Sequence, residues 1–342
     1  MKYVDVGGAR VSAIGLGTWQ FGSTEWGYGA DYAEREADAI VQRALDVGIT
    51  LFDTAEIYGF GRSERILGKA LGSRRDEAFI ASKIFPVLPV GPVVLHRARG
   101  SLRRLGVDAL DLYQLHQPNP VVPFSSTMPA FAQLLDEGVV RNVGVSNYSL
   151  ARWEAAQEAL GRPVLSNQVR YSLVDRRPEK ELLPWAQAND RLIIGYSPLA
   201  QGLLSARYDE KNRPSGMVRA ASPAFHPENL RRAGPLLEVL RQIAETHHAT
   251  ASQIALAWLI RRPNVVVIPG ASSAAQVEVN AAAADIELTD DEDRVLVGAS
   301  DAFEPLGATS VLPDLIRERF SGFLDRMTGG TGGSGGRGPA SS

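Results

Sequence analysis

Leu51-Phe52-Asp53-Thr54-Ala55-Glu56-Ile57-Tyr58-Gly59 is the stretch that decides the fold, because it begins as a buried strand and ends as a polar loop. Its apolar start runs directly into a carboxylate, and a tyrosine follows in the loop. Two later strands end in the same way: Phe79-Ile80-Ala81-Ser82 leads to Lys83, and Leu110-Asp111-Leu112-Tyr113-Gln114-Leu115 leads to His116. We therefore predict that Asp53, Tyr58, Lys83 and His116 lie together at the ends of three successive strands, as one rim of an active site.

These four side chains have complementary chemistry. A tyrosine phenol has a pKa of ~10 in water, too high for easy proton donation at neutral pH, and a nearby ammonium lowers it. We expect Lys83 to supply that ammonium and Asp53 to hold Lys83 in place and charged. His116 is expected to donate a hydrogen bond to a substrate oxygen. A general acid of this kind contributes ~10²–10⁴-fold in rate. Taken singly, each residue is more often a cap, a packing residue or a solvated side chain; their occurrence together favours catalysis.

The composition narrows the class of protein. The chain has 342 residues, of which 44% are hydrophobic, enough for a large core. Its net charge of -3 gives no basic surface for nucleic acid. It has no cysteine, which excludes disulfides, thiolate metal sites and a cysteine nucleophile. The start has no apolar signal core and no apolar run approaches ~18 residues, so we expect a soluble cytoplasmic protein.

The rest of the chain alternates between strand and helix patterns. Residues 3–12 alternate around Gly7-Gly8, which suggests a short β-hairpin. Strands are then expected at 14–19, 51–53, 79–83, 110–115, 139–145, 164–169, 192–196 and 265–268. Helices are expected at 33–47, 63–71, 93–105, 128–137, 150–160, 179–188, 236–247, 252–261, 273–284 and 290–299. Ser63-Glu64 is expected to cap the second helix, and a long polar segment covers 201–234.

This alternation predicts an α/β protein: a (β/α)8 TIM barrel with an N-terminal β-hairpin and extra helices. The strands read as continuous apolar runs, as strands buried on both faces should. A doubly wound open sheet is the alternative, but Gly15-Leu16-Gly17 lacks the third glycine of a dinucleotide-binding loop. We predict a single domain over residues 1–325 and a flexible glycine-rich tail over residues 326–342.

Several motifs, in this order, resemble those of the aldo-keto reductases from about Lys2 to about Ala299. They are Phe52-Asp53-Thr54-Ala55, Tyr58-Gly59, Ser63-Glu64, Lys83, Asp111-Leu112-Tyr113-Gln114-Leu115-His116, Gly144-Val145-Ser146-Asn147-Tyr148, Asn167-Gln168, Tyr196-Ser197-Pro198-Leu199 and Ile268-Pro269-Gly270-Ala271. The likeness is to bacterial members close to the potassium-channel β-subunit branch. It implies a (β/α)8 barrel and reversible carbonyl reduction by a nicotinamide, usually NADPH, without a metal. It also implies that Tyr58 is the acid/base, that Lys83 and Asp53 tune it, and that His116 orients the carbonyl.

The resemblance further implies a cofactor site that follows the later strands. Ser146, Asn147 and Gln168 look like the groups that hydrogen-bond the nicotinamide amide. Tyr196 looks like the aromatic residue that stacks on the nicotinamide ring. The other cofactor-binding residues implied are Ser197, Pro198, Leu199 and Gln201 around the pyrophosphate, Gly270, Ser272, Gln276 and Asn280 around the adenosine, and Thr18, Trp19 and Asp53. Ser272 and Ser273 could equally be helix caps.

The chain departs from the family pattern at the site of the 2′-phosphate. Many NADPH-preferring relatives carry Lys or Arg just after the last strand, whereas Gly270 to Asn280 contains no basic residue, and Val279 stands where several relatives carry an acid. The channel β-subunit branch recruits basic residues from the long loop after the seventh strand, where this chain has Arg207 and Arg219. Either could instead be a solvated loop arginine. We predict NADPH preference, with Arg207 as a principal contact.

Two classes of function remain open. The leading one is an NADPH-dependent oxidoreductase that reduces aldehyde, ketone or sugar-like carbonyls in small molecules. The alternative is a redox-sensing regulatory subunit that binds NADP(H) and turns over slowly. The substrate itself is not predicted. Candidate pocket walls are Trp19, Trp26, Tyr28, Phe60, Phe85 and Pro86, some of which could be ordinary packing residues. Segments 22–29 and 201–234 could act as a mobile rim and a lid.

Overall fold

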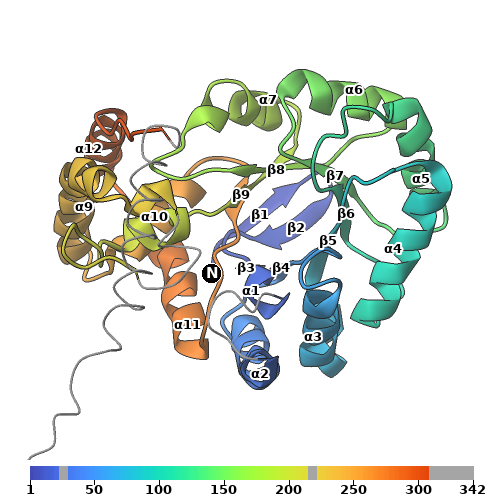
Figure 1. Ribbon diagram of the computed structural model, residues 1–342, viewed down its shortest axis with the longest axis horizontal. Coiled ribbons are helices and arrows are strands. Elements are labelled where there is room, and N and C mark those ends of the chain that lie inside the picture. The colour runs from blue at the N-terminus through green and yellow to red at the C-terminus, as the bar shows by residue number, and fades with distance from the viewer. Residues whose placement is uncertain (23–29, 215–221, 308–342) are drawn as a thin grey trace, which may run out of the picture.

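The computed structural model of the protein describes residues 1–22, 30–214 and 222–307 and contains two sheets (Figure 1). The first is an antiparallel hairpin of β1 (Tyr3–Val6) and β2 (Ala9–Ser12). The second is a parallel sheet of eight strands in sequence order. Its strands are β3 (Leu16–Gly17), β4 (Leu51–Asp53), β5 (Phe79–Ile84), β6 (Leu112–Leu115), β7 (Val143–Ser146), β8 (Ser166–Arg170), β9 (Leu192–Tyr196) and β10 (Val265–Val267).

The parallel sheet curls until its first and last strands meet. Ile14, just before β3, forms a parallel bridge with Val267 of β10. The Gly15 amide donates to the Val267 carbonyl at 2.7 Å, and the Gly17 amide donates to the Pro269 carbonyl at 3.1 Å. A doubly wound sheet would reverse its strand order at a switch point, and the sequential order excludes it. The predicted α/β class, the eight parallel strands and the N-terminal hairpin are confirmed.

Helices surround this sheet (Figure 1). Those of the surrounding ring are α2 (Ala30–Asp46), α3 (Arg62–Leu71), α4 (Gly91–Leu105), α5 (Phe124–Asp136), α6 (Leu150–Leu160), α7 (Leu182–Ala188), α10 (Ala251–Ile260) and α11 (Ala274–Ala282). A short helix, α1 (Trp19–Gly22), follows β3, while α9 (Pro227–Thr246) and α12 (Asp290–Asp301) pack against each other beside the ring. Within the described ranges, none of these helices combines the length and the apolar character needed to cross a membrane.

The hairpin closes one end of the curled sheet. Val6 and Val11 are buried in one apolar cluster with residues of the parallel strands. The other buried members of this cluster are Leu51, Ala81, Leu112, Leu192, Ile194, Val266 and, just after β10, Ile268. Burial of this cluster fills the interior at the end where the parallel strands begin.

The interior changes from apolar to polar along the strands. Side chains two positions apart in a strand face the same side of a sheet, so in β4 the inward-facing Leu51 is followed by an inward-facing Asp53. In β5 the same step leads from Ala81 to Lys83, and the register partner of Lys83 in β6 is Gln114. All three polar residues are buried. The polar part of the interior therefore lies at the end where the strands lead into their helices.

The polar segment expected over 201–234 is shorter than predicted, because α9 begins at Pro227. The predicted helix began only at residue 236, after Gly234 and Pro235. The proline lies inside the helix, where it removes one backbone donor. Leu230, before it, and Leu236, after it, are both buried. Their common burial holds the two halves in one helix. Two 3₁₀ turns, η3 (Ala200–Ser205) and η4 (Pro223–Phe225), occupy part of the remaining segment.

Ser63 is not the N-cap of α3, which corrects a second prediction. The N-cap is Gly61, whose φ of 81° is left-handed, and it makes no side-chain cap bond. Ser63 is buried instead: its hydroxyl donates to the Thr18 carbonyl at 2.8 Å and lies 3.0 Å from the Thr54 hydroxyl. Capping preference is a local tendency of serine, and partners distant in sequence override it here. Ser273, by contrast, caps α11 by accepting from the Gln276 amide.

Other boundaries differ by a few residues. β6 and β7 begin later than predicted, since Leu110 and Val140 form only an isolated bridge. Helices α2, α4 and α5 begin earlier than predicted, and α7 begins later. The predicted tail over 326–342, the end of the predicted domain, Trp26, Tyr28 and Arg219 lie outside the described residues.

Candidate active site

The Lys83 ammonium is the centre of the predicted catalytic group. It is fully buried and donates to Asp53 Oδ1 at 2.5 Å, to the Thr54 carbonyl at 2.9 Å and to the Tyr58 hydroxyl at 3.3 Å. An ammonium has three protons to donate, and these three acceptors use all of them. The register of β4 with β5, in which Asp53 lies opposite Ala81, brings the two strand ends together. The structure thus brings Asp53, Tyr58 and Lys83 into direct contact.

Asp53 also links this group to the later strands. Its second oxygen, Oδ2, accepts from Gln168 Nε2 at 2.7 Å across the interior. Burial alone would lower the pKa of Lys83, but Asp53 and Tyr58 together hold it above its ordinary value. Lys83 is therefore charged, as expected. The side chain of Gln168, predicted as a nicotinamide ligand, is thereby fixed against the predicted catalytic carboxylate.

Tyr58 departs from the expectation in its proton affinity. Burial raises the pKa of its phenol above the ordinary value, and the Lys83 ammonium opposes this rise without reversing it. The predicted net lowering of this pKa is therefore wrong, because desolvation of a phenolate outweighs one ammonium at 3.3 Å. The neutral phenol is the stable form, which suits a proton donor. The loop itself is tightly held, since a Cβ on Gly22 would lie 2.5 Å from the Tyr58 carbonyl carbon.

His116 faces the same group from the end of β6. Its ring lies edge-on to Tyr58, with centroids 5.7 Å apart, and edge-on to Phe85 at 6.1 Å. Burial, and then the nearby Lys83 ammonium, lower the pKa of His116 to about 3. Its Nδ1 atom is buried and has no hydrogen-bond partner among the described residues. His116 is thus a neutral imidazole with one nitrogen unpaired beside the tyrosine.

The residues predicted to hold the nicotinamide lie next to this group. Asn147 Nδ2 donates to Ser146 Oγ at 3.0 Å, and the Tyr196 hydroxyl donates to Asn147 Oδ1 at 2.9 Å. The Asn147 amide donates to the Gln168 carbonyl at 2.9 Å. These hydrogen bonds join the ends of β7, β8 and β9 into one polar surface. Asn147 has a left-handed φ of 62°, which asparagine tolerates better than most residues.

The predicted pyrophosphate loop has an unusual backbone. Ser197 and Gln201 have left-handed φ values of 51° and 60°, and both are half-buried. Pro198 is buried and Leu199 packs partly against the core. The Gln201 Oε1 atom is buried without a hydrogen-bond partner in the described parts of the chain. A strained loop that carries an unpaired polar atom is typical of a ligand site.

The predicted adenosine residues form a second cluster at the start of α11. Gln276 Oε1 accepts from both the Ser272 amide, at 2.8 Å, and the Ser272 hydroxyl, at 3.0 Å. Asn280 is buried and donates to the Gly270 carbonyl at 3.4 Å. Gln20 of α1, which the prediction did not include, donates to the Ala271 carbonyl at 2.8 Å. This contact connects the segment after β10 with the segment after β3.

The other predicted cofactor residues differ in their surroundings. Thr18 is buried, and its hydroxyl donates to the Asp53 carbonyl at 2.9 Å, so it positions the predicted catalytic strand end. Trp19 is 43% exposed at the start of α1. Arg207 is exposed, follows η3, and its carbonyl accepts from Asn212. No contact between Arg207 and the α11 cluster is recorded within the described residues.

Hydrogen bonds also fix the loops after β5 and β6. Arg97 Nε donates to Glu56 Oε2 at 2.9 Å, and its Nη1 donates to the Val87 carbonyl at 3.2 Å. Asn119 Nδ2 donates to the Pro86 carbonyl at 2.7 Å. The sequence analysis did not identify Glu56, Arg97 and Asn119 as site residues, and it also missed Gln114. Gln114 could have been found from the sequence, because it is a glutamine within the apolar run of β6 and is in register with Lys83.

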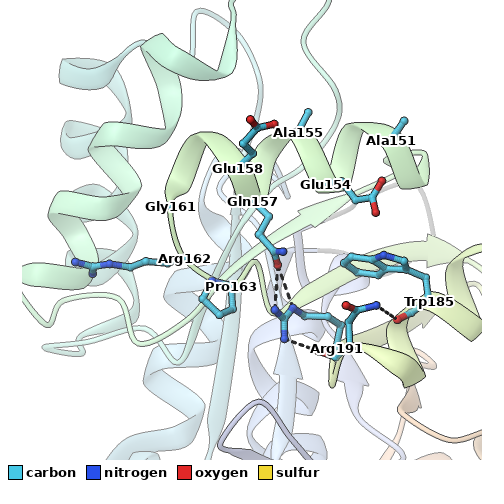
Figure 2. Close-up of a pocket in the computed structure, with 11 residues that line it drawn as sticks. Ala151, Glu154, Ala155, Gln157, Glu158, Gly161, Arg162, Pro163, Trp185 and Arg191 are labelled. Carbon is cyan, nitrogen blue, oxygen red and sulfur yellow. Dashed lines mark hydrogen bonds between the residues drawn. The ribbon is translucent and has the colours of Figure 1, made fainter.

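An open hollow of about 790 Å³ lies elsewhere, between α6 and α7 (Figure 2). Trp185 and Arg191 line it, and Arg191 donates to Gln157 Oε1 at 3.1 Å. Glu154 and Glu158 of α6 are on its other side. None of the predicted catalytic or cofactor residues lines it. The candidate site is therefore defined by its buried polar contacts and not by this hollow.

Known proteins are similar to this chain in sequence and in fold. The sequence profile of the Aldo/keto reductase family matches residues 13–298. An uncharacterized oxidoreductase of Mycobacterium tuberculosis strain H37Rv is 56% identical over 322 residues, which cover 94% of this chain and 99% of that protein. Methylglyoxal reductase of Escherichia coli strain K12 is 34% identical over 308 residues, with 89% and 96% covered. The crystal structure of an aldo/keto reductase from Klebsiella pneumoniae in complex with NADP and acetate has a TM-score of 0.72 and 33% identity, covering 89% of this chain and 96% of that chain.

The environment of His116 predicts how its imidazole titrates. Because the pKa of His116 is lowered to about 3, its ring stays neutral throughout the range of about pH 5 to 8 in which histidines ordinarily change charge. In NMR spectra of ring-labelled protein, the His116 signal, assigned by its loss in His116→Asn, should not shift over that range. Free imidazole in the same tube is the reference. A midpoint near ~6.5 would show that the ring is hydrated and that this description is wrong.

Proposed function

This chain belongs to the aldo/keto reductase family, and on that premise we propose that it is an NADPH-dependent oxidoreductase that reduces aldehyde or ketone carbonyls to alcohols. The observation that carries the proposal is the buried Lys83 ammonium in contact with both Asp53 and Tyr58. The enzyme names of the relatives support an oxidoreductase over a regulatory subunit. We further propose a single (β/α)8 barrel domain for residues 1–325.

In the proposed mechanism, Tyr58 is the general acid. Its neutral phenol protonates the carbonyl oxygen, and the Lys83 ammonium, 3.3 Å away, stabilises the phenolate that remains. Asp53 keeps Lys83 charged and aimed at the phenol. The neutral imidazole of His116 donates a hydrogen bond to the same carbonyl oxygen, which positions the carbonyl and stabilises negative charge as it develops. A bound NADPH supplies the hydride.

The polar strand ends support NADP(H) as the cofactor. Gln168 contacts Asp53, and Asn147 and Tyr196 contact each other on the neighbouring strand ends. Together they present amide and phenol groups, a set that suits an amide-bearing ring. The unpaired Oε1 of Gln201, on the loop after β9, offers an acceptor to a ribose hydroxyl. We propose that this loop and the α11 cluster hold the pyrophosphate and adenosine, with the start of α11 favouring an anion. The solved relative in complex with NADP supports this choice.

Apolar side chains on the opposite half of the mouth support a class of substrate. Five large apolar residues in the loops after β3 to β6 are exposed, with Phe60 at 87% and Val121 at 84%. We call this set the apolar rim: Trp19, Phe60, Val87, Leu88 and Val121. Exposure of large apolar side chains at a single edge is characteristic of binding surfaces. We propose that the carbonyl group of the substrate is attached to a large apolar group that contacts this rim.

The first test replaces the proposed acid. Tyr58→Phe removes the proton donor and leaves the ring, so kcat for reduction of a reactive aromatic aldehyde should fall ~10²–10⁴-fold. Binding of NADPH, followed by quenching of protein fluorescence, should be unchanged. Tyr3→Phe is the matched control, because Tyr3 donates to the Gly48 carbonyl near the hairpin and should keep full activity. Full turnover by Tyr58→Phe would refute the mechanism.

The second test concerns the choice of cofactor. If Arg207 pairs with the 2′-phosphate, Arg207→Ala loses a charge-assisted contact, and the ratio of kcat/KM with NADPH to that with NADH should fall at least ~10-fold. Lys211→Ala, an exposed cation in the same segment, should leave the ratio unchanged. An unchanged preference in Arg207→Ala would remove Arg207 from the site.

The third test measures the substrate preference with straight-chain aldehydes. Each methylene that reaches the apolar rim should raise kcat/KM by about twofold, less than the fourfold or so of complete burial. The double variant Phe60→Asn with Leu88→Asn should flatten this dependence, and asparagine suits the left-handed φ of both positions, 52° and 47°. Val295→Asn on α12 is the control. Equal kcat/KM for methylglyoxal and a long aldehyde would disprove the substrate class but not the reductase.

A further inference from the structure

A second hollow of about 570 Å³ lies on the outside of the ring, between α3 and α4. We call it the α3–α4 pocket. Five of its lining residues are cationic: Arg65, Lys69, Arg75, Arg103 and Arg104. The helices run back from the ends of β4 and β5 to the starts of the next strands. Their last turns, and with them most of this pocket, therefore lie toward the end of the sheet opposite the candidate active site.

Fewer of the cations of this pocket are paired with carboxylates than is the case for the other arginines of the described residues. Only Arg104 pairs with a carboxylate, that of Glu64, at 2.5 Å. Within the described residues, Arg65, Lys69, Arg75 and Arg103 take part in no recorded ion pair. Most other arginines of the described residues form an ion pair. The chain as a whole is acidic, with a net charge of -3, so carboxylates are available for such pairing. Uncompensated like charges gathered in one hollow repel each other and attract an anion.

Glycines keep the floor of the pocket open to the guanidinium groups. A Cβ at Gly100 would lie 3.1 Å from Arg104 Nη1 and 3.9 Å from Arg103 Nη2. A Cβ at Gly106 would lie 3.7 Å from Arg75 Nη1. Gly106 is the left-handed C-cap of α4, but Gly100 is inside the helix, where glycine is less stable than alanine by about 1 kcal/mol. The side chains of Arg75, Arg103 and Arg104 thus lie close to two positions, Gly100 and Gly106, that carry no side chain.

Part of this arrangement has an ordinary explanation. Lys69 is in the last turn of α3, and Arg103 and Arg104 are in the last turn of α4, where cations stabilise the helix dipole. Arg75, just beyond the end of α3, also has such a role, because its Nε donates to the carbonyl of the C-cap residue Gly72 at 3.1 Å. The explanation does not extend to Arg65, in the first half of α3. Nor does it explain why all five converge on one hollow.

We propose that the α3–α4 pocket binds a phosphate group. Guanidinium groups bind two oxygens of a phosphate at once, and Arg75, Arg103 and Arg104 offer such groups over the glycine floor. The exposed Arg65 and Lys69 supply further positive charge at the rim. The phosphate could belong to a small soluble molecule or to a lipid headgroup. The site is separate from the proposed cofactor site and does not depend on it.

Calorimetric titration with inorganic pyrophosphate tests the proposal. Saturating NADP⁺ is present, so that phosphate sites on the cofactor side are filled. The wild type should bind pyrophosphate with a Kd below about 1 mM at low ionic strength. Arg103→Gln should weaken binding about tenfold, the usual effect of one charge-assisted contact. Arg65→Gln, which removes positive charge at the rim, should weaken it by a smaller factor. Arg99→Gln is the matched control, because Arg99 is an exposed residue of α4 paired with Glu137 outside the pocket.

A second arm distinguishes the sources of the phosphate. Flotation with phosphatidylcholine vesicles, with and without phosphatidic acid, shows whether a lipid headgroup is bound, and the same variants are compared. Binding to pyrophosphate, to the acidic vesicles, or to both, that weakens in Arg65→Gln and Arg103→Gln but not in Arg99→Gln, supports the proposal. No binding in either arm overturns it. Binding that all three variants retain equally overturns it as well.

Discussion

The structure depends on one buried cation. An ammonium removed from water is destabilising by several kcal/mol unless its protons are all paired, and Lys83 finds its three acceptors on β4 and the loop that follows it. This requirement fixes the register of β4 against β5. It also requires that Thr54 turn its carbonyl inward and that Tyr58 return toward the strand end. Thr18, just before α1, donates to the Asp53 carbonyl, and Ser63 of α3 donates in turn to the Thr18 carbonyl. The ion pair is therefore weak evidence for stability and strong evidence for a site that must be held in one geometry.

The position of this cation along its strand follows from a period of two. Inward-facing residues alternate with outward-facing ones, so a strand that presents an apolar residue to the hairpin presents its next inward residue one layer further along. Leu51 and Asp53 are such a pair, and so are Ala81 and Lys83. The hairpin needs apolar partners, and the interior beyond it is polar. The sequence of β4 and β5 therefore encodes both the closed end of the sheet and the end that carries the chemistry.

Much of this could be predicted from local patterns, and the failures have physical causes. The strand end at Asp53 was predictable because an apolar run stops abruptly at a charged residue. The strand predicted to end at Lys83 ends one residue later, at Ile84. The pKa of Tyr58 was not predictable, because it depends on how much water the fold excludes, and burial outweighs the ammonium. Ser63 was misassigned because its hydroxyl is used by residues distant in sequence. The start of α9 was missed because a proline inside a helix is tolerated when the flanking residues are buried.

Backbone strain separates the two ends of the sheet in the same way as polarity does. At the end near the hairpin, left-handed positions that follow helices are occupied by residues that accept them, such as Gly106, Gly161 and Asn264. At the other end, Phe60, Leu88, Ser197 and Gln201 adopt the same conformation, at about 1–3 kcal/mol each. Glycine would remove that strain but also the side chain. Retaining a large apolar or polar side chain at such positions makes sense only if the side chain is needed where the strained backbone puts it. On one half of the mouth that need is apolar, and on the other it is polar, which is the division a carbonyl substrate and a nicotinamide cofactor would require.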